Sequence, residues 1–223
     1  SSTSFLIFII LIQSYIYKYK SSLLYIYITM FKQIFGECIY VGEFSKNTHD
    51  QIKEILTKGK DEKKKGSWGL CQVESTFFSN INMDNFNVNE YDELFEEELR
   101  THIKHINTNI KFTIQNCWHN IYKKKDFQEP HHHLNADFTS LSCIYCVCES
   151  DAKLYFTNPH HTIQTLSKID KIFKNENYNS IYYPELKEGS LLIFPSYLYH
   201  GVSPQKTDTE RITIACNIMI HSI

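Results

Sequence analysis

Three consecutive histidines, His131 to His133, are the residues of this chain whose type and spacing most clearly predict chemistry. They follow Pro130 directly, and in an extended segment side chains alternate between two faces. If this stretch is extended, His131 and His133 project from one face and His132 from the other. Neutral imidazoles suit iron, zinc, copper or nickel, so the pair provides half of a metal site.

A third imidazole comes much later in the chain, at His200. It follows the apolar run Gly189–Pro195, which is typical of a buried strand, and it precedes Gly201. A histidine just beyond the end of a buried strand is well placed at the mouth of a β-barrel. Taken alone, the run His131–His133 could be a histidine-rich loop, and His200 could be a structural histidine. Their order and spacing together favour a metal site.

Arg211 lies eleven residues after His200 and begins the apolar segment RITIACNIMI. If this segment is a strand, Thr213, Ala215 and Asn217 share the face of Arg211, and that face is smaller and more polar than the isoleucine-rich one. A buried guanidinium needs an anionic partner, and a planar carboxylate can satisfy it with two hydrogen bonds. The alternative is a surface salt bridge.

Other histidines and cysteines receive structural interpretations. Cys143 and Cys146 are three residues apart, and on a strand they face opposite ways, so we expect buried reduced thiols rather than a zinc or redox motif. His102 and His105 are expected on the surface of an amphipathic helix. His160 and His161 are expected in a solvent-facing loop.

Composition excludes several classes of protein. The chain has 223 residues, 42% of them hydrophobic, and a net charge of −2, which fits one domain with a real core. The near balance of charge gives no nucleic-acid signal, and the charged segment 58–66 is interpreted as a solvated loop. Seven cysteines without a sequon predict a reducing, cytoplasmic location.

Residues 1–29 differ in composition from the rest of the chain and are interpreted as an apolar N-terminal extension. The continuous apolar run Phe5–Ile12 is too short to span a bilayer. We interpret the extension as translated upstream sequence, with a weak membrane anchor or an ordinary additional strand or helix as the alternatives. We expect residues 30–223 to form the single domain. Membrane attachment therefore depends on whether this extension is a genuine anchor.

The elements that position the candidate site follow from hydrophobic periodicity. An edge strand is expected over Ile34–Phe44, a helix after Thr48 and a second helix over Asn89–Ile106. Short β-type runs then follow, at Lys111–Tyr122, Ser140–Cys148, Lys153–Phe156, Ser180–Tyr183, Ser190–Phe194 and Arg211–Ile220. The order predicts a mainly β fold with flanking helices, a sandwich or barrel with the helices on one side.

Several segments resemble the 2-oxoglutarate/Fe(II)-dependent oxygenases of marine microbes and their phages. The matching segments are Cys117–Tyr122, Gln128–His133, Leu141–Val147, Gly189–Ser196, then His200, Val202, Pro204, Arg211 and Ile214–Asn217. They are similar to the family's W-x-N, P-H-x-H-P-x-S, S-G-V-Y-Y-V, G-x-L-L-x-F-P-S, H-x-V-x-P and R-x-S-x-A-F-N patterns. This chain departs from them at Leu134, which replaces a proline, and at Cys143 and Cys146, which replace a glycine and a tyrosine. The resemblance covers about residues 32–220 and implies a double-stranded β-helix, or jelly roll.

The resemblance also implies a site. His131 and His200 match the two iron histidines, His133 matches the second ligand of an H-x-H motif, and Arg211 matches the residue that binds the distal carboxylate of 2-oxoglutarate. Most 2-oxoglutarate oxygenases use a carboxylate as the second ligand, so Asp137 is an alternative to His133. Tyr122 and Asn120 match a cosubstrate-binding tyrosine and a pocket-wall residue.

We therefore expect a dioxygenase that uses Fe(II), 2-oxoglutarate and O₂ to oxidise an organic substrate, releasing succinate and CO₂. The substrate and the oligomeric state do not follow from the sequence, because fold does not set function. Two alternatives stay open at this point. One is a three-histidine cupin-type metalloenzyme that does not use 2-oxoglutarate, and the other is a jelly-roll binding module with a vestigial site.

Overall fold

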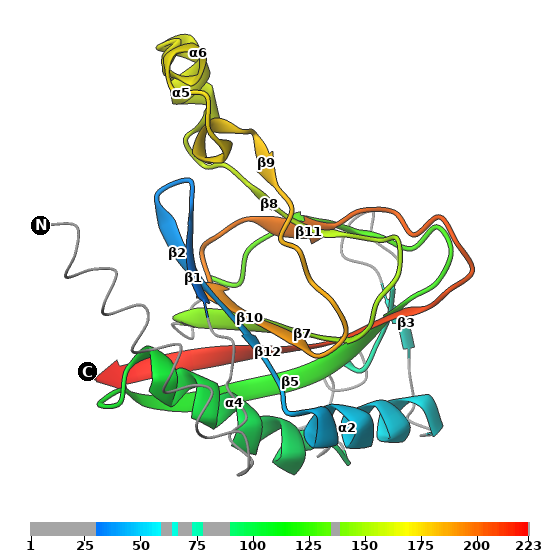
Figure 1. Ribbon diagram of the computed structural model, residues 1–223. Coiled ribbons are helices and arrows are strands. Elements are labelled where there is room, and N and C mark those ends of the chain that lie inside the picture. Colours follow the sequence, from blue (N-terminus) through cyan, green and yellow to red (C-terminus); the bar gives the residue numbers. More distant parts are fainter. Residues whose placement is uncertain (1–29, 59–63, 67–72, 78–89, 135–138, 223) are drawn as a thin grey trace, which may run out of the picture.

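A computed structural model of the chain describes residues 30–58, 64–66, 73–77, 90–134 and 139–222 (Figure 1). The strands are β1 (Met30–Ile34), β2 (Glu37–Glu43), β3 (Lys64–Gly66), β4 (Val73–Ser75), β5 (Lys111–Tyr122), β6 (Gln128–His131), β7 (Leu141–Cys148), β8 (Leu154–Thr157), β9 (Ile181–Tyr182), β10 (Ser190–Pro195), β11 (His200–Val202) and β12 (Arg211–Ser222). The helices are α2 (Lys46–Lys58), α4 (Asp92–Ile106), α5 (His161–Leu166), α6 (Ile169–Ile172) and the 3-10 turn η1 (Glu176–Tyr178). Residues 1–29, expected as an extension, lie outside the described ranges.

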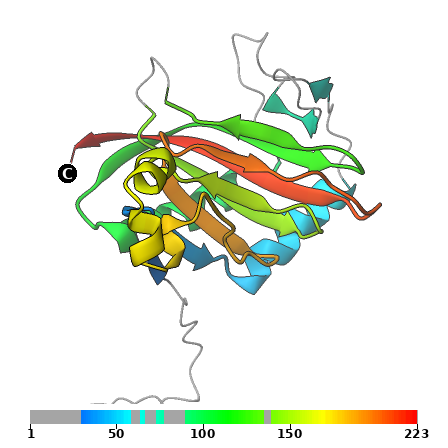
Figure 2. The same ribbon diagram turned by 90° about the horizontal axis from the view of Figure 1, so that it is seen from above.

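The described strands form two sheets, which confirms the mainly β prediction. The large sheet has the order β1-β2-β10-β7-β12-β5-β4-β3, and the small sheet has the order β6-β11-β8-β9. The small sheet faces one side of the large sheet, and α2 and α4 cover the other side (Figures 1 and 2). The two sheets lie against each other without closing into one barrel.

Strand β12 illustrates how alternation builds both faces of the large sheet. It lies between β7 and β5 and is antiparallel to both. Its apolar set packs in the core beneath the helices: Ile212, Ile214, Cys216 and Ile218, together with Ile52 and Leu56 of α2 and Phe95 and Leu99 of α4. The opposite face of β12 turns toward the small sheet, so the strand supplies both the core and the candidate site.

A second core fills the space between the sheets. Phe194 of β10 meets Phe156 of β8 edge to face, with ring centroids 5.0 Å apart. Leu192 and Tyr122 come to this core from the large sheet, and Leu154 comes from the small one. Because these buried side chains join the two sheets, they hold the loops and strand ends of the candidate site at fixed separations.

The six strands expected after Asn109 are all present, with small shifts of their ends. The prediction that Ile34–Phe44 forms an edge strand is wrong. The strand in this range, β2, is paired on both sides, with β1 and with β10. Met30–Ile34 supplies the additional strand β1, and Phe35 and Gly36, both with positive φ, turn the chain between them. Hydrophobic periodicity did not reveal that β2 is paired on both sides, because its partner β10 is distant in the sequence.

The expectation of a surface position is wrong for His102, which is fully buried on α4, although His105 is exposed. The Nδ1 atom of His102 lies 2.8 Å from the hydroxyl of Tyr40. A Cβ atom at Gly42 would stand 2.8 Å from the His102 ring, so glycine at that position makes room for the imidazole. Helix α4 begins at Asp92, and Asn89, its expected cap, lies outside the described residues.

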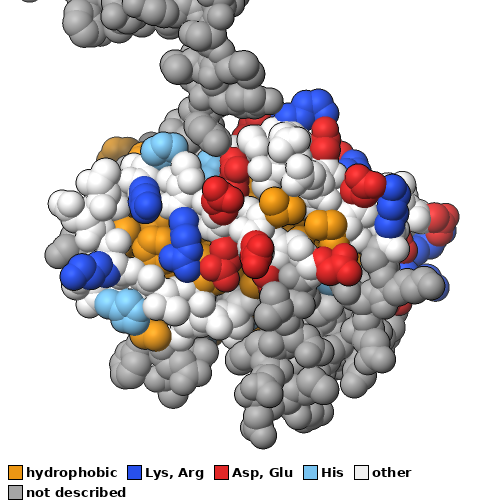
Figure 3. All heavy atoms as spheres, turned by 90° about the horizontal axis from the view of Figure 1, so that it is seen from below, with side chains coloured by type: hydrophobic (Ala, Val, Ile, Leu, Met, Phe, Trp, Pro, Cys, Tyr) orange, Lys and Arg blue, Asp and Glu red, His pale blue; other side chains and the backbone are white. Residues whose placement is uncertain are grey.

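Two surfaces complete the fold. The outer side of α2 and α4 carries charges of both signs (Figure 3), including the pairs Lys58–Glu54 and Arg100–Glu96 along the helices. Helices α5 and α6 with η1 form an excursion between β8 and β9 that projects from the small sheet (Figure 1). Within the ranges that the structure describes, no helix is long and apolar enough to cross a bilayer.

Candidate metal centre

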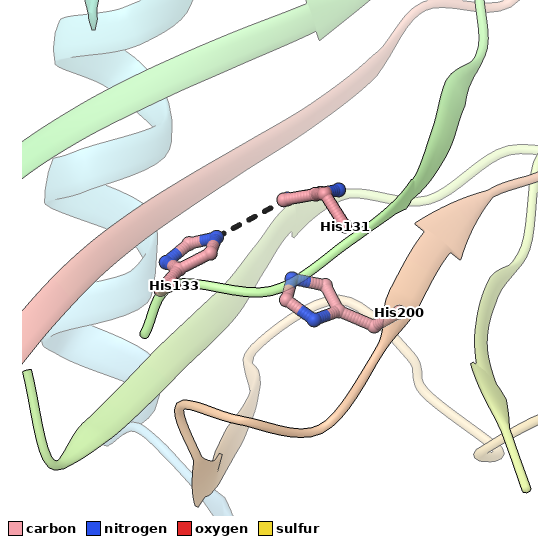
Figure 4. Close-up of side chains that lie close together, drawn as sticks. All are labelled: His131, His133 and His200. Atoms are coloured by element: carbon pink, nitrogen blue, oxygen red, sulfur yellow. Dashed lines mark hydrogen bonds between the residues drawn. The ribbon is translucent and has the colours of Figure 1, made fainter. Parts of the chain in front are cut away.

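Three imidazoles meet where β6 and β11 lie side by side (Figure 4). One nitrogen from each of His131, His133 and His200 lies within 4.8 Å of the other two. The Nε2 atoms of His131 and His133 are 3.1 Å apart, and the ring centroids of His131 and His200 are 4.4 Å apart. The structure therefore brings together the three histidines that the sequence singled out.

Backbone pairing fixes this arrangement. His131 ends β6 and pairs with His200, which begins β11. His133 follows β6, and its backbone N–H donates to the carbonyl oxygen of Ser196 at 2.8 Å. The β6–β11 register shifts before Val202 pairs with Gln128, and such a bulge redirects side chains. As a result Gln128 also reaches the site, with Nε2 3.4 Å from Nε2 of His131.

Each of the three rings is oriented by a hydrogen bond from Nδ1 to an oxygen that can only accept. The acceptors are the carbonyl oxygen of Glu129 for His131 at 2.9 Å, Oδ1 of Asn217 for His133 at 2.7 Å, and the carbonyl oxygen of Leu198 for His200 at 2.9 Å. Because Nδ1 carries the proton, Nε2 keeps its lone pair in each neutral ring. Metal-binding histidines are typically oriented in this way.

Burial keeps these imidazoles neutral. Desolvation lowers the pKa of His133 to about 4 against the pull of its hydrogen bond to Asn217. Desolvation also lowers the pKa of His131 and lowers that of His200 well below its ordinary value. Three unprotonated Nε2 atoms that face a shared point are a donor set that a divalent transition metal accepts.

Arg211 lies in a small pocket that adjoins the three histidines. Its side chain is 3% exposed, and its guanidinium carbon lies 5.6 Å from the centre of the Tyr122 ring. No carboxylate of the described residues forms an ion pair with Arg211; its neighbour Glu210 lies 4.0 Å from Lys123 instead. Burial raises the pKa of the nearby Cys146 thiol to about 11, so Cys146 provides no anion. The pocket therefore holds a buried cation without a described counter-charge.

Tyr122 and Asn120 line the same pocket, on the strand beside Arg211. The Tyr122 hydroxyl donates to Oε1 of Gln128 at 2.9 Å, which links the arginine end of the pocket to His131. Oδ1 of Asn120 is buried without a hydrogen-bond partner among the described residues. Sequence reasoning missed Gln128, because only the bulge in β6 brings its side chain to the site.

A second and larger pocket, of about 1040 Å³, opens on the same imidazoles. It continues along β5 and β12 away from Arg211, past Asn116 and Asn217. Its described lining is Phe77, Asn116, Trp118, Gln128, Glu129, His131, His132, His133, Leu134 and Asn217. Phe77 and Asn116 were not singled out from the sequence, since no motif or periodicity marks them, and Glu129 was quoted only within the segment Gln128–His133, without a role.

The remaining sequence candidates lie elsewhere or outside the described residues. Asp137, the alternative second ligand, belongs to the undescribed range 135–138. His132 turns toward the ring of Tyr199, 4.8 Å away, and does not join the cluster. Cys143 packs in the core beneath the helices while Cys146 lines a cavity beside Arg211, so the two face opposite sides of β7 as expected. His160 is exposed, and His161 begins α5.

Solved structures share this fold at low sequence identity. The non-heme alpha ketoglutarate dependent epimerase SnoN from nogalamycin biosynthesis is 10% identical with a TM-score of 0.55, and the match covers 80% of this chain and 78% of that one. HygX from Streptomyces hygroscopicus, solved with nickel and 2-oxoglutarate, is 10% identical with a TM-score of 0.54 and coverages of 81% and 82%. A Pseudomonas putida prolyl-4-hydroxylase is 13% identical with a TM-score of 0.50 and coverages of 78% and 86%. These likenesses confirm the double-stranded β-helix.

Residues 116–217 match the family model described as "Putative 2OG-Fe(II) oxygenase". No curated protein sequence matches the chain. The matched range contains the three clustered histidines, Arg211 and Asn217. The sequence match over residues 116–217 and the fold of the described residues agree with each other, and both are those of 2OG-Fe(II) oxygenases.

Proposed function

We propose that this protein is an Fe(II)- and 2-oxoglutarate-dependent dioxygenase in which His131, His133 and His200 hold the iron and Arg211 binds the distal carboxylate of 2-oxoglutarate. In the overall reaction 2-oxoglutarate, O₂ and a substrate C–H bond give succinate, CO₂ and a C–OH group. The observation that carries the proposal is the juxtaposition of a three-imidazole cluster with a buried arginine in one pocket.

The donor atoms of the cluster fit a divalent iron. Their separations, all within 4.8 Å, match nitrogens that share one ion at about 2.0–2.2 Å each after small ring rotations. Three protein ligands leave coordination positions open, as a metal that must also bind a cosubstrate requires. When bound, Fe(II) supplies the activation of O₂ that no amino-acid side chain can provide.

The pocket beside the cluster fits the cosubstrate. Arg211 presents a planar guanidinium, and the described residues offer it no carboxylate, so a dicarboxylate ligand supplies the missing charge. Thr213 lies two residues further along the same face and lines the same pocket. Asn120 has an unpartnered amide oxygen there, and Tyr122 stacks near the guanidinium. We assign both residues to the wall of the 2-oxoglutarate pocket.

The protein's other contribution is to orient the ligands and to exclude water. Carbonyl oxygens hold the Nδ1–H groups of His131 and His200, and Asn217 holds that of His133. Leu154, Val202 and Ile144 line the arginine pocket as apolar wall. A dry, fixed surround strengthens charge–charge contacts and protects a reactive oxidant from side reactions.

The test is the formation of succinate from 2-oxoglutarate by the purified full chain with Fe(II), ascorbate and air. The proposal expects slow uncoupled turnover without a substrate, dependence on Fe(II), and inhibition by a metal chelator. Retention of one metal ion without any binding or turnover of 2-oxoglutarate would instead indicate a three-histidine metalloenzyme that does not use this cosubstrate. Retention of neither metal nor 2-oxoglutarate would indicate a binding module.

A further inference from the structure

The two pockets that meet at the histidine cluster differ in charge. The pocket beside Arg211 has this cation and no acidic residue in its described lining. The larger pocket has one acid, Glu129, and no lysine or arginine in its described lining. An anion is therefore favoured on one side of the histidines, and the other side favours a ligand that is neutral or positively charged.

Two residues that line the larger pocket, Glu129 and Asn116, carry hydrogen-bond acceptors that lack partners. Oε2 of Glu129 and Oδ1 of Asn116 are both buried, and neither has a hydrogen-bond partner among the described residues. A buried acceptor that stays unsatisfied is costly, and the cost is greater for a carboxylate than for an amide. The amide oxygen of Asn217 is already used by His133. A ligand that fits this pocket therefore brings N–H or O–H donors.

Two aromatic rings form part of the wall of the larger pocket. The Phe77 and Trp118 rings are arranged edge to face with centroids 5.2 Å apart, and Trp118 lies 5.8 Å from the ring of His133. Aromatic faces attract organic cations and pack against the apolar chain that carries them. At the rim, Leu134 is 56% exposed. The pocket thus combines an apolar, aromatic wall with a single negative charge.

We propose that the substrate carries an alkylammonium or guanidinium group, which Glu129 binds with help from Asn116 while its carbon chain packs against Trp118 and Phe77. Glu129 is two residues before His131, so a group held there lies close to the reaction centre. A phosphate or carboxylate in the same position would meet Glu129 with no described cation to offset the repulsion. This substrate class rests on the proposed function for its reaction, but its recognition depends only on the chain's own pocket.

Binding of four Nα-acetyl amino-acid amides to the full chain tests the proposal, with and without Fe(II) and 2-oxoglutarate and in the absence of air. The probes are derivatives of lysine, arginine, norleucine and glutamate, measured by calorimetry. The lysine or arginine derivative should bind about tenfold or more tightly than the norleucine derivative, as a charge-assisted hydrogen bond contributes. Glu129→Gln should reduce this preference to near one. Glu54→Gln, which removes an exposed acid on α2, is the matched control and should leave the preference for the lysine or arginine derivative unchanged.

Four outcomes would each overturn the inference. They are equal binding of all four probes, tighter binding of the glutamate derivative, no binding of the lysine and arginine derivatives, or an unchanged preference for these two derivatives in Glu129→Gln. Binding of 2-oxoglutarate, measured in the same preparation, separates the two claims. If 2-oxoglutarate binds and the cations do not, the substrate class is wrong and the proposed function stands. If the cations bind and 2-oxoglutarate does not, the pocket assignment stands and the proposed function fails.

Discussion

Oδ1 of Asn217 lies 2.7 Å from Nδ1 of His133, although 84 residues separate them in the chain. Asn217 is on the same face of β12 as Arg211, six residues further along. One strand therefore carries both the buried cation of the arginine pocket and the residue that orients an imidazole of the cluster. In the proposed site, β12 sets the spacing between cosubstrate and metal.

Replacing Asn217 with alanine should weaken Fe(II) binding about 10- to 100-fold, because the His133 ring loses the acceptor that fixes its tautomer and orientation. The dissociation constant for Fe(II), measured anaerobically by competition with a chelator, checks this. Asn217→Asp supplies an acceptor at the same place and should restore most of the affinity. Equal affinity in wild type and Asn217→Ala would show that this hydrogen bond does not tune the ligand.

Alanine replacement of His131, His133 or His200 should abolish retention of iron, since two imidazoles hold a divalent ion far more weakly than three. The HHH run supplies its own control: His132 turns away toward Tyr199, so His132→Ala should keep the metal. Iron content after desalting and thermal unfolding of the metal-free variants separate loss of a ligand from loss of folding.

The same series decides the second ligand. Retention of iron by His133→Ala, with loss in Asp137→Asn, would assign that position to Asp137 and leave the enzyme class intact. Loss in His132→Ala would contradict the arrangement of the cluster itself.

Arg211→Lys should raise the KM for 2-oxoglutarate by about 30-fold or more, because loss of a hydrogen bond to a charged group costs about 1.5–3 kcal/mol. Lysine keeps the charge but cannot present a planar, two-donor grip on a carboxylate. The chain's other arginine is the matched control: Arg100 pairs with Glu96 on the exposed side of α4, so Arg100→Lys should leave the KM unchanged. A KM that moves equally in both variants would remove the special role of Arg211.

Burial of His102 predicts a dependence of stability on pH. Desolvation lowers its pKa from 6.5 to about 4, so between these values the unfolded chain binds more protons than the folded one. The free energy of unfolding therefore falls as pH decreases through this window, by up to about 1.4 kcal/mol per pH unit from this group. Denaturant unfolding of the metal-free protein at pH 4.5 and 7 should show a smaller difference in His102→Gln than in His105→Gln. An equal difference in both variants would mean that His102 titrates normally.

Which side chains of an extended segment share a face is a local property, and the sequence predicted it correctly. Arg211, Thr213 and Ala215 share one face of β12, and His131 and His133 point to one site while His132 does not. Strands β5, β7, β10 and β12 also follow the expected ranges closely.

Features that depend on distant neighbours did not follow from the pattern. Burial of His102 depends on Gly42 and Tyr40, which belong to another element. Gln128 enters the site through a register shift between β6 and β11, and Asn217 meets His133 only when the sheet has formed. Hydrophobic periodicity predicts which face of an element is buried. It does not predict which elements pair or in what register, and these contacts depend on both.

The most direct test of the proposed site is an anaerobic titration of the Fe(II)-loaded full chain with 2-oxoglutarate, followed by calorimetry and visible absorption. The account predicts one equivalent of 2-oxoglutarate per iron, with binding that weakens about 30-fold or more in Arg211→Lys and disappears in His200→Ala. A chain that retains iron but binds no 2-oxoglutarate, or that binds it equally well in Arg211→Lys, would contradict the account.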